Sequence, residues 1–183
     1  MKKYTLLLFV LALSACSTSQ KITAVKTANG NLVGIANKAS FLQAPYQGWF
    51  TRNYKNYNPD ATTIAALSKQ LKGVTIKGFM GTWCGDSKRQ TPRVYQVLEQ
   101  AGFNEKNMTL VTVNRRKKTP DNLQKGHHIV RVPTFIFYKD GKEIGRFVEY
   151  PRVTIEKDFL QIVSGQPYKH SYEKPFPKKK NRH

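Results

Sequence analysis

Apolar residues along the chain follow two periods from residue 60 onward, one typical of helices and one typical of strands. Ile64, Leu67 and Leu71 recur at helical spacing, which predicts a helix that ends at the glycine following them. Residues 74–80, VTIKGFM, are rich in strand formers and predict a buried strand. Apolar residues spaced three and four apart over residues 94–101 predict a second helix.

The second half of the chain predicts further strands, a hairpin and a closing helix. Residues 108–114 and 134–139 each form a short apolar strand pattern. The dipeptide Asp140-Gly141 then predicts a tight turn into residues 142–150. A last amphipathic helix is indicated by an apolar face made of Ile155, Phe159, Ile162 and Val163. Alternating helices and strands predict an α/β domain whose sheet is covered on both faces.

The first fifteen residues have the layout of a secretory signal. Two lysines precede an apolar run over residues 6–13, which is too short to span a membrane. The stretch LSAC, residues 13–16, resembles the lipobox of bacterial lipoproteins, which implies removal of residues 1–15 and lipidation of Cys16. The alternative is an ordinary cleaved signal followed by a chance cysteine. Because Ser17 follows the cysteine in place of an aspartate, the resemblance favours the outer membrane of a bacterial cell envelope over the inner one, with the protein facing the periplasm.

Composition divides the remaining chain into four parts. Residues 16–30 are polar and lack periodicity, so we predict a lipidated spacer. Residues 31–59 form an N-terminal extension whose aromatic part predicts a short amphipathic helix. Residues 60–164 carry the periodic pattern and predict the folded domain. Residues 165–183 are basic and rich in proline, which predicts a flexible tail.

The chain is strongly basic, with 31 Lys and Arg against 11 Asp and Glu and a formal net charge of +20. The charge is densest in the tail and in residues 114–118, NRRKK. Such segments attract anionic partners, and anionic lipid is the nearest one for a protein at a membrane. No base-stacking motif accompanies the basic runs, so nucleic acid is not an expected partner. The alternative is that both runs serve solubility only.

Cys84 is the candidate reactive group, because Cys16 would be consumed as an anchor. It lies where the strand of residues 74–80 ends and the following helix begins. Backbone N–H groups at a helix N-terminus favour nearby negative charge, so a thiolate is favoured there. Cys84 is therefore placed for nucleophilic reactivity.

The chain resembles the thioredoxin-like family at several positions. The stretch WCGDS, residues 83–87, is similar to the active-site motif of that family, with Trp83 and Gly85 flanking the cysteine. Pro92 matches a proline of its active-site helix. The stretch RVPTFIFYKDGKEIGRF resembles the segment in which a cis-proline, here Pro133 after Val132, faces the cysteine and an incoming peptide.

The resemblance covers roughly residues 60–164 and implies a thioredoxin-like fold, a central mixed sheet flanked by helices, with residues 31–59 as an N-terminal extension. More narrowly, the stretches GTWCGDSKR and YPRVTIEKDFLQIV resemble those of a group of envelope thioredoxin-like proteins from the Bacteroidetes. An envelope lipoprotein of this family would act on disulfide- or thiol-containing envelope proteins.

Three positions depart from the family pattern. The second active-site cysteine is replaced by Ser87, the usual proline between the two is Asp86, and the buried acid six residues before the cysteine is Gly78. Ser87 cannot resolve a mixed disulfide, so the site is predicted to be of the monothiol, CxxS type. A hydrogen bond from Ser87 would favour the Cys84 thiolate, whereas an inward Asp86 carboxylate would oppose it.

Two adjacent histidines, His127 and His128, raise the alternative of a metal site with Cys84. Adjacent side chains on an extended segment point apart, and a facing cis-proline would crowd a metal. We therefore expect neither a metal nor a cofactor.

Two functions fit the sequence. The first is monothiol thiol–disulfide exchange, either reduction or isomerisation, in which Cys84 attacks and an external thiol donor completes the cycle. The second is a non-catalytic thioredoxin-fold module that binds or retains client proteins. The presence of Cys84 between Trp83 and Gly85 favours the first.

Overall fold

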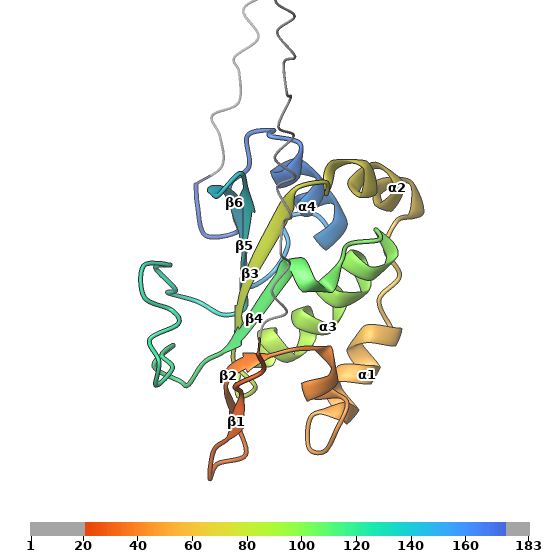
Figure 1. Cartoon of the computed structure of the whole chain (residues 1–183). Coiled ribbons are helices and arrows are strands. Elements are labelled where there is room, and N and C mark those ends of the chain that lie inside the picture. Colours follow the sequence, from red (N-terminus) through yellow and green to blue (C-terminus); the bar gives the residue numbers. More distant parts are fainter. Residues whose placement is uncertain (1–20, 175–183) are drawn as a thin grey trace, which may run out of the picture.

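A computed structural model describes residues 21–174 and gives the fold in Figure 1. The predicted signal peptide, Cys16 and residues 175–183 of the predicted tail lie outside the described residues. Within residues 21–174, every helix is too short or too polar to cross a membrane.

Six strands form one mixed sheet in the order β1-β2-β4-β3-β5-β6. Strands β3 and β4 are parallel, and every other neighbouring pair is antiparallel. Two predicted strands have the predicted bounds, residues 74–80 and 134–139. The strands are β1 (Val25–Lys26), β2 (Leu32–Ala36), β3 (Val74–Met80), β4 (Met108–Thr112), β5 (Thr134–Lys139) and β6 (Lys142–Val148).

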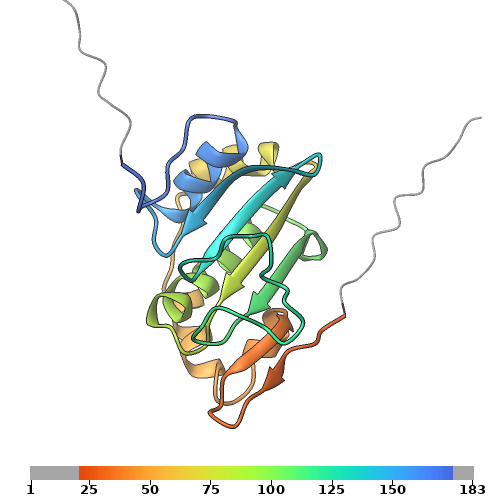
Figure 2. The same cartoon turned by 90° about the vertical axis from the view of Figure 1, so that its left-hand side faces the viewer.

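The helices lie on one face of this sheet, and an irregular segment covers the other. Figures 1 and 2 show the four α-helices together on one side and residues 113–133 crossing the opposite side. The predicted mixed sheet flanked by helices is confirmed. The helices cover one face of the sheet, and a long loop covers the other face. The helices are α1 (Gln47–Lys55), α2 (Ala61–Gln70), α3 (Gly85–Gln100) and α4 (Ile155–Val163), with short 3-10 turns η1 (Lys38–Phe41) and η2 (Glu105–Asn107).

Strand alternation divides the core between these two faces. On β3, Ile76 and Met80 pack against the helices, whereas Phe79 packs under the loop with Val111 and Ile136. The larger cluster holds most of the buried aromatic rings, including those of α1 and α4. Each fully buried side chain of this size stabilises the fold by roughly 1.5–3 kcal/mol, so the helix-covered face dominates stability.

The second half of the predicted spacer, residues 16–30, belongs to the sheet and its first turn. Val25 and Lys26 pair with β2, and the amides of Thr23 and Ala24 donate to the Ile35 carbonyl at 3.0 and 2.9 Å. The physical reason is that β2 has a free edge on its side away from β4. The sequence reading missed this hairpin since β1 is only two residues long.

The predicted short helix of the extension is α1. Its apolar side is aromatic, and Phe50 stacks on Phe41 with ring centroids 5.6 Å apart. Tyr95 of α3 lies 5.8 Å from the same Phe50 ring. The extension is therefore packed onto α3, the helix that follows Cys84.

Part of the predicted flexible tail, residues 168–173, is held against the domain. The Tyr168 hydroxyl donates to Asp158 at 2.9 Å, and Arg152 donates to the carbonyls of His170 and Glu173. Tyr172 also lies under Arg131, whose guanidinium carbon is 3.8 Å from the ring centroid. These polar and cation–π contacts bind residues 168–173 to the domain despite their low apolar content.

We predict that Gly78→Ala destabilises the domain by about 1–3 kcal/mol, the usual cost of an inserted methyl in a packed core. A Cβ at Gly78 would lie 2.8 Å from Leu110 Cδ1 and 2.8 Å from the Phe135 ring. Urea unfolding measures the change in the free energy of unfolding. Gly48→Ala in α1 is the control, since nothing lies within 4 Å of its Cβ position, and it should gain up to about 1 kcal/mol. Equal stability of the two variants would contradict this packing.

Candidate active site

Cys84 occupies the junction between the central strand and α3. The cysteine is the N-cap residue of α3 and is half-buried, and its side chain makes no capping hydrogen bond. Its amide donates to the Gly81 carbonyl at 2.9 Å, and its carbonyl accepts from Lys88 at 3.0 Å. The sulfur therefore lies at the positive end of the helix dipole, where negative charge is stabilised.

The carbonyl of Val132 is the polar group that faces the cysteine. Cys84 Sγ lies 3.3 Å from the Val132 carbonyl oxygen and donates to it as a thiol. The Val132–Pro133 peptide bond is cis, and both residues are buried. The Glu149 amide donates to the Pro133 carbonyl at 2.8 Å, which fixes this turn to the end of β6. The turn and the thiol are thus held in contact.

Trp83 ties the cysteine loop to the end of β4. Its indole Nε1 donates to the Val113 carbonyl at 2.8 Å, and its ring lies against Gly81. A Cβ at Gly81 would meet the ring at 2.5 Å, so only glycine leaves room for the indole. The sequence motif predicted Trp83 and Gly85 at the site, but gave no signal for this role of Gly81.

Ser87 has a structural contact in place of the one predicted from the sequence. Its side chain is fully buried, and its Oγ accepts a hydrogen bond from the Gly81 amide at 3.1 Å. In the described part of the chain, no hydrogen bond joins Ser87 to Cys84. The predicted hydrogen bond from Ser87 to Cys84 is not formed in the structure: the Cys84 thiol donates to Val132, and the Ser87 oxygen faces the backbone of the cysteine loop.

Asp86 is directed along the helix surface. Its carboxylate forms an ion pair with Arg89, one helical turn further on. Gly85, which precedes it, is exposed with nothing within 4 Å of its Cβ position. The negative charge of Asp86 is thus neutralised by a cation at the surface and complements the dipole of the first turn.

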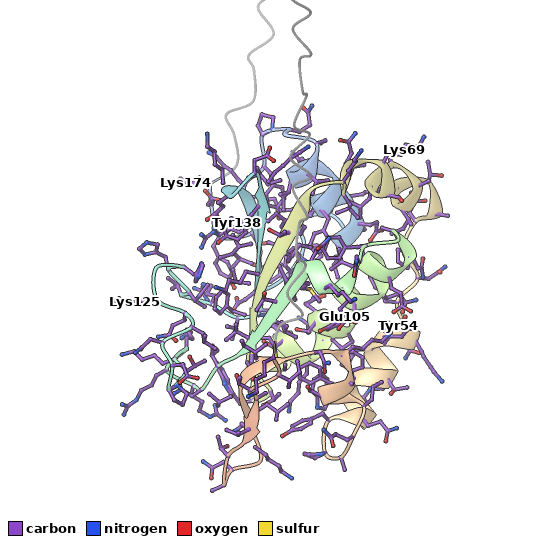
Figure 3. All side chains as sticks on the ribbon, viewed as in Figure 1. Tyr54, Lys69, Glu105, Lys125, Tyr138 and Lys174 are labelled. Carbon is purple, nitrogen blue, oxygen red and sulfur yellow. The ribbon has the colours of Figure 1, made fainter. Side chains whose placement is uncertain are left out.

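Cys84 and the two histidines do not form a joint site. His127 faces the loop-covered side of the sheet, where Nε2 is 3.0 Å from Lys77 Nζ and Nδ1 is 3.2 Å from Tyr138 Oη, labelled in Figure 3. Burial, together with the nearby positive charge of Lys77, lowers the pKa of His127 and favours its neutral form. His128 is exposed. Across residues 21–174 there is no group of three or more metal-ligating side chains.

The N-terminal hairpin also reaches the site, which sequence reasoning did not foresee. The Leu32 amide donates to Thr82 Oγ1 at 3.0 Å, and that hydroxyl donates to Asn31 Oδ1 at 3.3 Å. Thr82 lies two residues before the cysteine. The start of β2, which precedes the predicted domain of residues 60–164, therefore contacts the active-site loop. The contact joins residues 50 apart in sequence, and no local pattern could have revealed it.

Comparisons with known proteins identify the family of the chain. The sequence model of the family described as Thioredoxin matches residues 38–160, which is more than half of the chain. The chain therefore belongs to the thioredoxin family. Membership supports a thiol–disulfide redox role in general, and the matched range includes Cys84, Val132 and Pro133.

Two curated relatives and one solved structure illustrate the similarity. A thioredoxin-like protein of Acanthamoeba polyphaga mimivirus is 34% identical over 96 residues, 52% of this chain and 67% of the relative. The chloroplastic thioredoxin Y of Oryza sativa subsp. japonica is 32% identical over 81 residues, 44% of this chain and 45% of the relative. The chain thus spans less than half of the plant protein. A Pseudomonas aeruginosa protein of unknown function has the same fold, with a TM-score of 0.50, 18% identity, and coverage of 72% of this chain and 93% of that one.

We predict that Ser87→Ala lowers the free energy of unfolding by about 1–3 kcal/mol, because the buried Gly81 amide loses its acceptor. Chemical denaturation measures the loss. Ser68→Ala, at an exposed position of α2, is the matched control and should change stability by less than about 0.5 kcal/mol. If Ser87→Ala were as stable as the parent protein, the structural role of this hydroxyl would be refuted.

Proposed function

We propose that this protein performs monothiol thiol–disulfide exchange through Cys84. The observation that carries the proposal is the placement of a half-buried sulfur at the N-terminus of α3, 3.3 Å from the Val132 carbonyl oxygen. An attacking thiol needs an accessible face, which the half-buried Cys84 has, and the helix N-terminus is a favourable place for negative charge. Ser87 supplies no sulfur, so a second protein thiol does not take part.

The exchange proceeds in steps that balance atoms and electrons. The Cys84 thiolate attacks one sulfur of a substrate disulfide, the S–S bond breaks, and the other sulfur leaves as a thiolate. An external thiolate then attacks the mixed disulfide and releases the second substrate sulfur. A second external thiolate releases Cys84 and forms the external disulfide. Two electrons pass from two external thiols to one substrate disulfide.

Isomerisation uses the same first step. The substrate thiolate that has left, or another thiol of the same substrate, attacks the mixed disulfide and forms a new pairing, with no net oxidation or reduction. The alternative function, a module that retains client proteins, would stop at the mixed disulfide. Reduction, isomerisation and retention therefore differ in what happens after the first attack.

The proposal includes anchoring in a bacterial envelope. LSAC at residues 13–16 supports lipidation of Cys16, and the signal-like residues 1–15 support export. Substrates would then be disulfide- or thiol-containing envelope proteins, and the reducing thiol would come from outside the protein. The net charge of +20 supports additional attraction to anionic lipid.

We predict turnover of a peptide disulfide only when a small monothiol is present. The protein carries Cys16→Ser so that Cys84 is the one remaining cysteine of the two in the sequence. Without the monothiol, mass spectrometry should find a stoichiometric mixed disulfide on Cys84, because nothing in the protein resolves it. Release of the free peptide thiol measures turnover.

Cys84→Ser is the control for this experiment and should form no adduct. An adduct that the monothiol cannot release would favour client retention over catalysis. Absence of any adduct with folded protein would overturn both functions.

We also predict that a labelled fatty acid is incorporated when the chain is expressed in a bacterium, and that Cys16→Ser abolishes the label. Cys84→Ser should keep it, because that cysteine is not at the lipobox. Gel autoradiography of the membrane fraction measures incorporation. A chain that is cleaved but unlabelled would instead identify an ordinary signal peptide.

A further inference from the structure

The basic run NRRKK, residues 114–118, forms a turn with a fixed shape next to the active site. We call it the basic turn. The side chain of Asn114 accepts from the amides of Arg116 and Lys118 at 2.9 and 3.0 Å, and its backbone amide donates to the Lys118 carbonyl at 3.1 Å. These three hydrogen bonds organise four consecutive cationic residues. The backbone of these four residues is therefore held in place by Asn114.

The basic turn is attached to the residue that precedes the reactive cysteine. Val113, immediately before the turn, accepts from the Trp83 indole at 2.8 Å and donates from its amide to the Met80 carbonyl at 2.8 Å. The Arg115 guanidinium carbon lies 5.4 Å from the centre of the Trp83 ring. The position of Arg115 relative to the cysteine loop is therefore set by buried strand contacts and by the indole.

A cavity of about 390 Å³ opens between the basic turn and the N-terminal hairpin, and Trp83 forms part of its wall. Arg115 and Arg116 line one side, and the hairpin residues Asn29 and Asn31 line the other. Its charged lining is cationic, and the asparagines add amide groups. Figure 3 shows nitrogen-tipped side chains extending outward from the loop-covered side of the sheet, the side on which Lys125 is labelled.

The two arginines of this cavity have no carboxylate partner within residues 21–174. Other arginines near the site are neutralised, since Arg89 pairs with Asp86 and Arg131 pairs with Glu149 at 3.6 Å. Arg115 and Arg116 form no such ion pair in the described chain. Guanidinium groups bind carboxylates through paired hydrogen bonds, so an unpaired arginine couple at a cavity suits an acidic side chain.

We propose that this cavity binds an acidic side chain of the substrate polypeptide, close to the cysteine that Cys84 attacks. The inference rests on the proposed exchange function and specifies its substrate class. A segment whose disulfide lies over Cys84 can extend past Trp83 into the cavity, because Trp83 lines the cavity and directly precedes Cys84 in the chain. The basic turn then selects disulfides flanked by Asp or Glu and raises the rate of encounter with them.

The test compares three peptides of equal length, each with one cysteine as a 2-thiopyridyl mixed disulfide and with Glu, Gln or Lys beside it. Attack by Cys84 forms a protein–peptide disulfide and releases thiopyridone, whose absorbance gives a second-order rate constant without any external thiol. The full chain with Cys16→Ser is used. The Glu peptide should react about threefold to tenfold faster than the Gln peptide, as expected for two exposed ion pairs. The Lys peptide should react more slowly than both.

The variant Arg115→Gln/Arg116→Gln should remove most of the preference for Glu over Gln, measured as the ratio of the rate constants of the two peptides with the same variant. The matched control is Lys69→Gln/Lys72→Gln, which removes the same charge from exposed positions at the end of α2 and beyond it, and should keep the preference. Lys69 is labelled in Figure 3 on the helix-covered side, away from the basic turn. Added salt should narrow the preference in the parent protein.

The outcomes separate this inference from the proposed function. Suppose that Cys84 reacts equally fast with the Glu and Gln peptides, and faster than a free small thiol reacts with either peptide. That result would overturn the acidic-substrate inference and leave the exchange function standing. A preference that survives Arg115→Gln/Arg116→Gln but falls in the lysine variant would also overturn it, because net charge would then be the cause. Failure of Cys84 to react with any peptide would overturn the exchange function itself.

Discussion

The register of the central strand is the constraint on which the active site depends. Strand β3 pairs in parallel with β4, with Met80 opposite Thr112, and antiparallel with β5, with Phe79 opposite Thr134. The end of β3, the end of β4 and the start of β5 therefore lie side by side at the same end of the strands. Cys84, the basic turn and Pro133 each follow or precede one of these points. They converge because strand pairing brings them together, although they are distant in sequence.

The elements of the central domain could be predicted from local pattern, because each buries a face with its own period. Residues 74–80 and 134–139 are apolar runs bounded by turn signals, and the Asp140-Gly141 turn shows a direct hairpin signal. The hairpin of β1 and β2 could not be predicted in the same way. Its position is set by pairing with the edge of the sheet and by the hydrogen bond to Thr82. Neither contact can be predicted from the local sequence of residues 23–36.

The site was predictable as a set of residue types and not as a set of contacts. The cysteine motif indicated Cys84, and the resemblance implied the cis bond before Pro133 that the structure has. The hydrogen-bond partner of the Ser87 hydroxyl depends on which buried amide lacks an acceptor, and the sequence does not show which amide that is. Likewise, residues 168–173 have the composition of a tail, yet Arg152 and Asp158 supply enough hydrogen bonds to hold them.

The serine at position 87 has a kinetic consequence for the proposed mechanism. Because Ser87 carries no sulfur, release of the mixed disulfide becomes a bimolecular event whose rate rises with the concentration of thiol outside the protein. A dithiol site would instead release its product at a rate set by its own geometry. The lifetime of the covalent complex would then report the thiol supply of the compartment: it would be brief where thiols are abundant and prolonged where they are scarce.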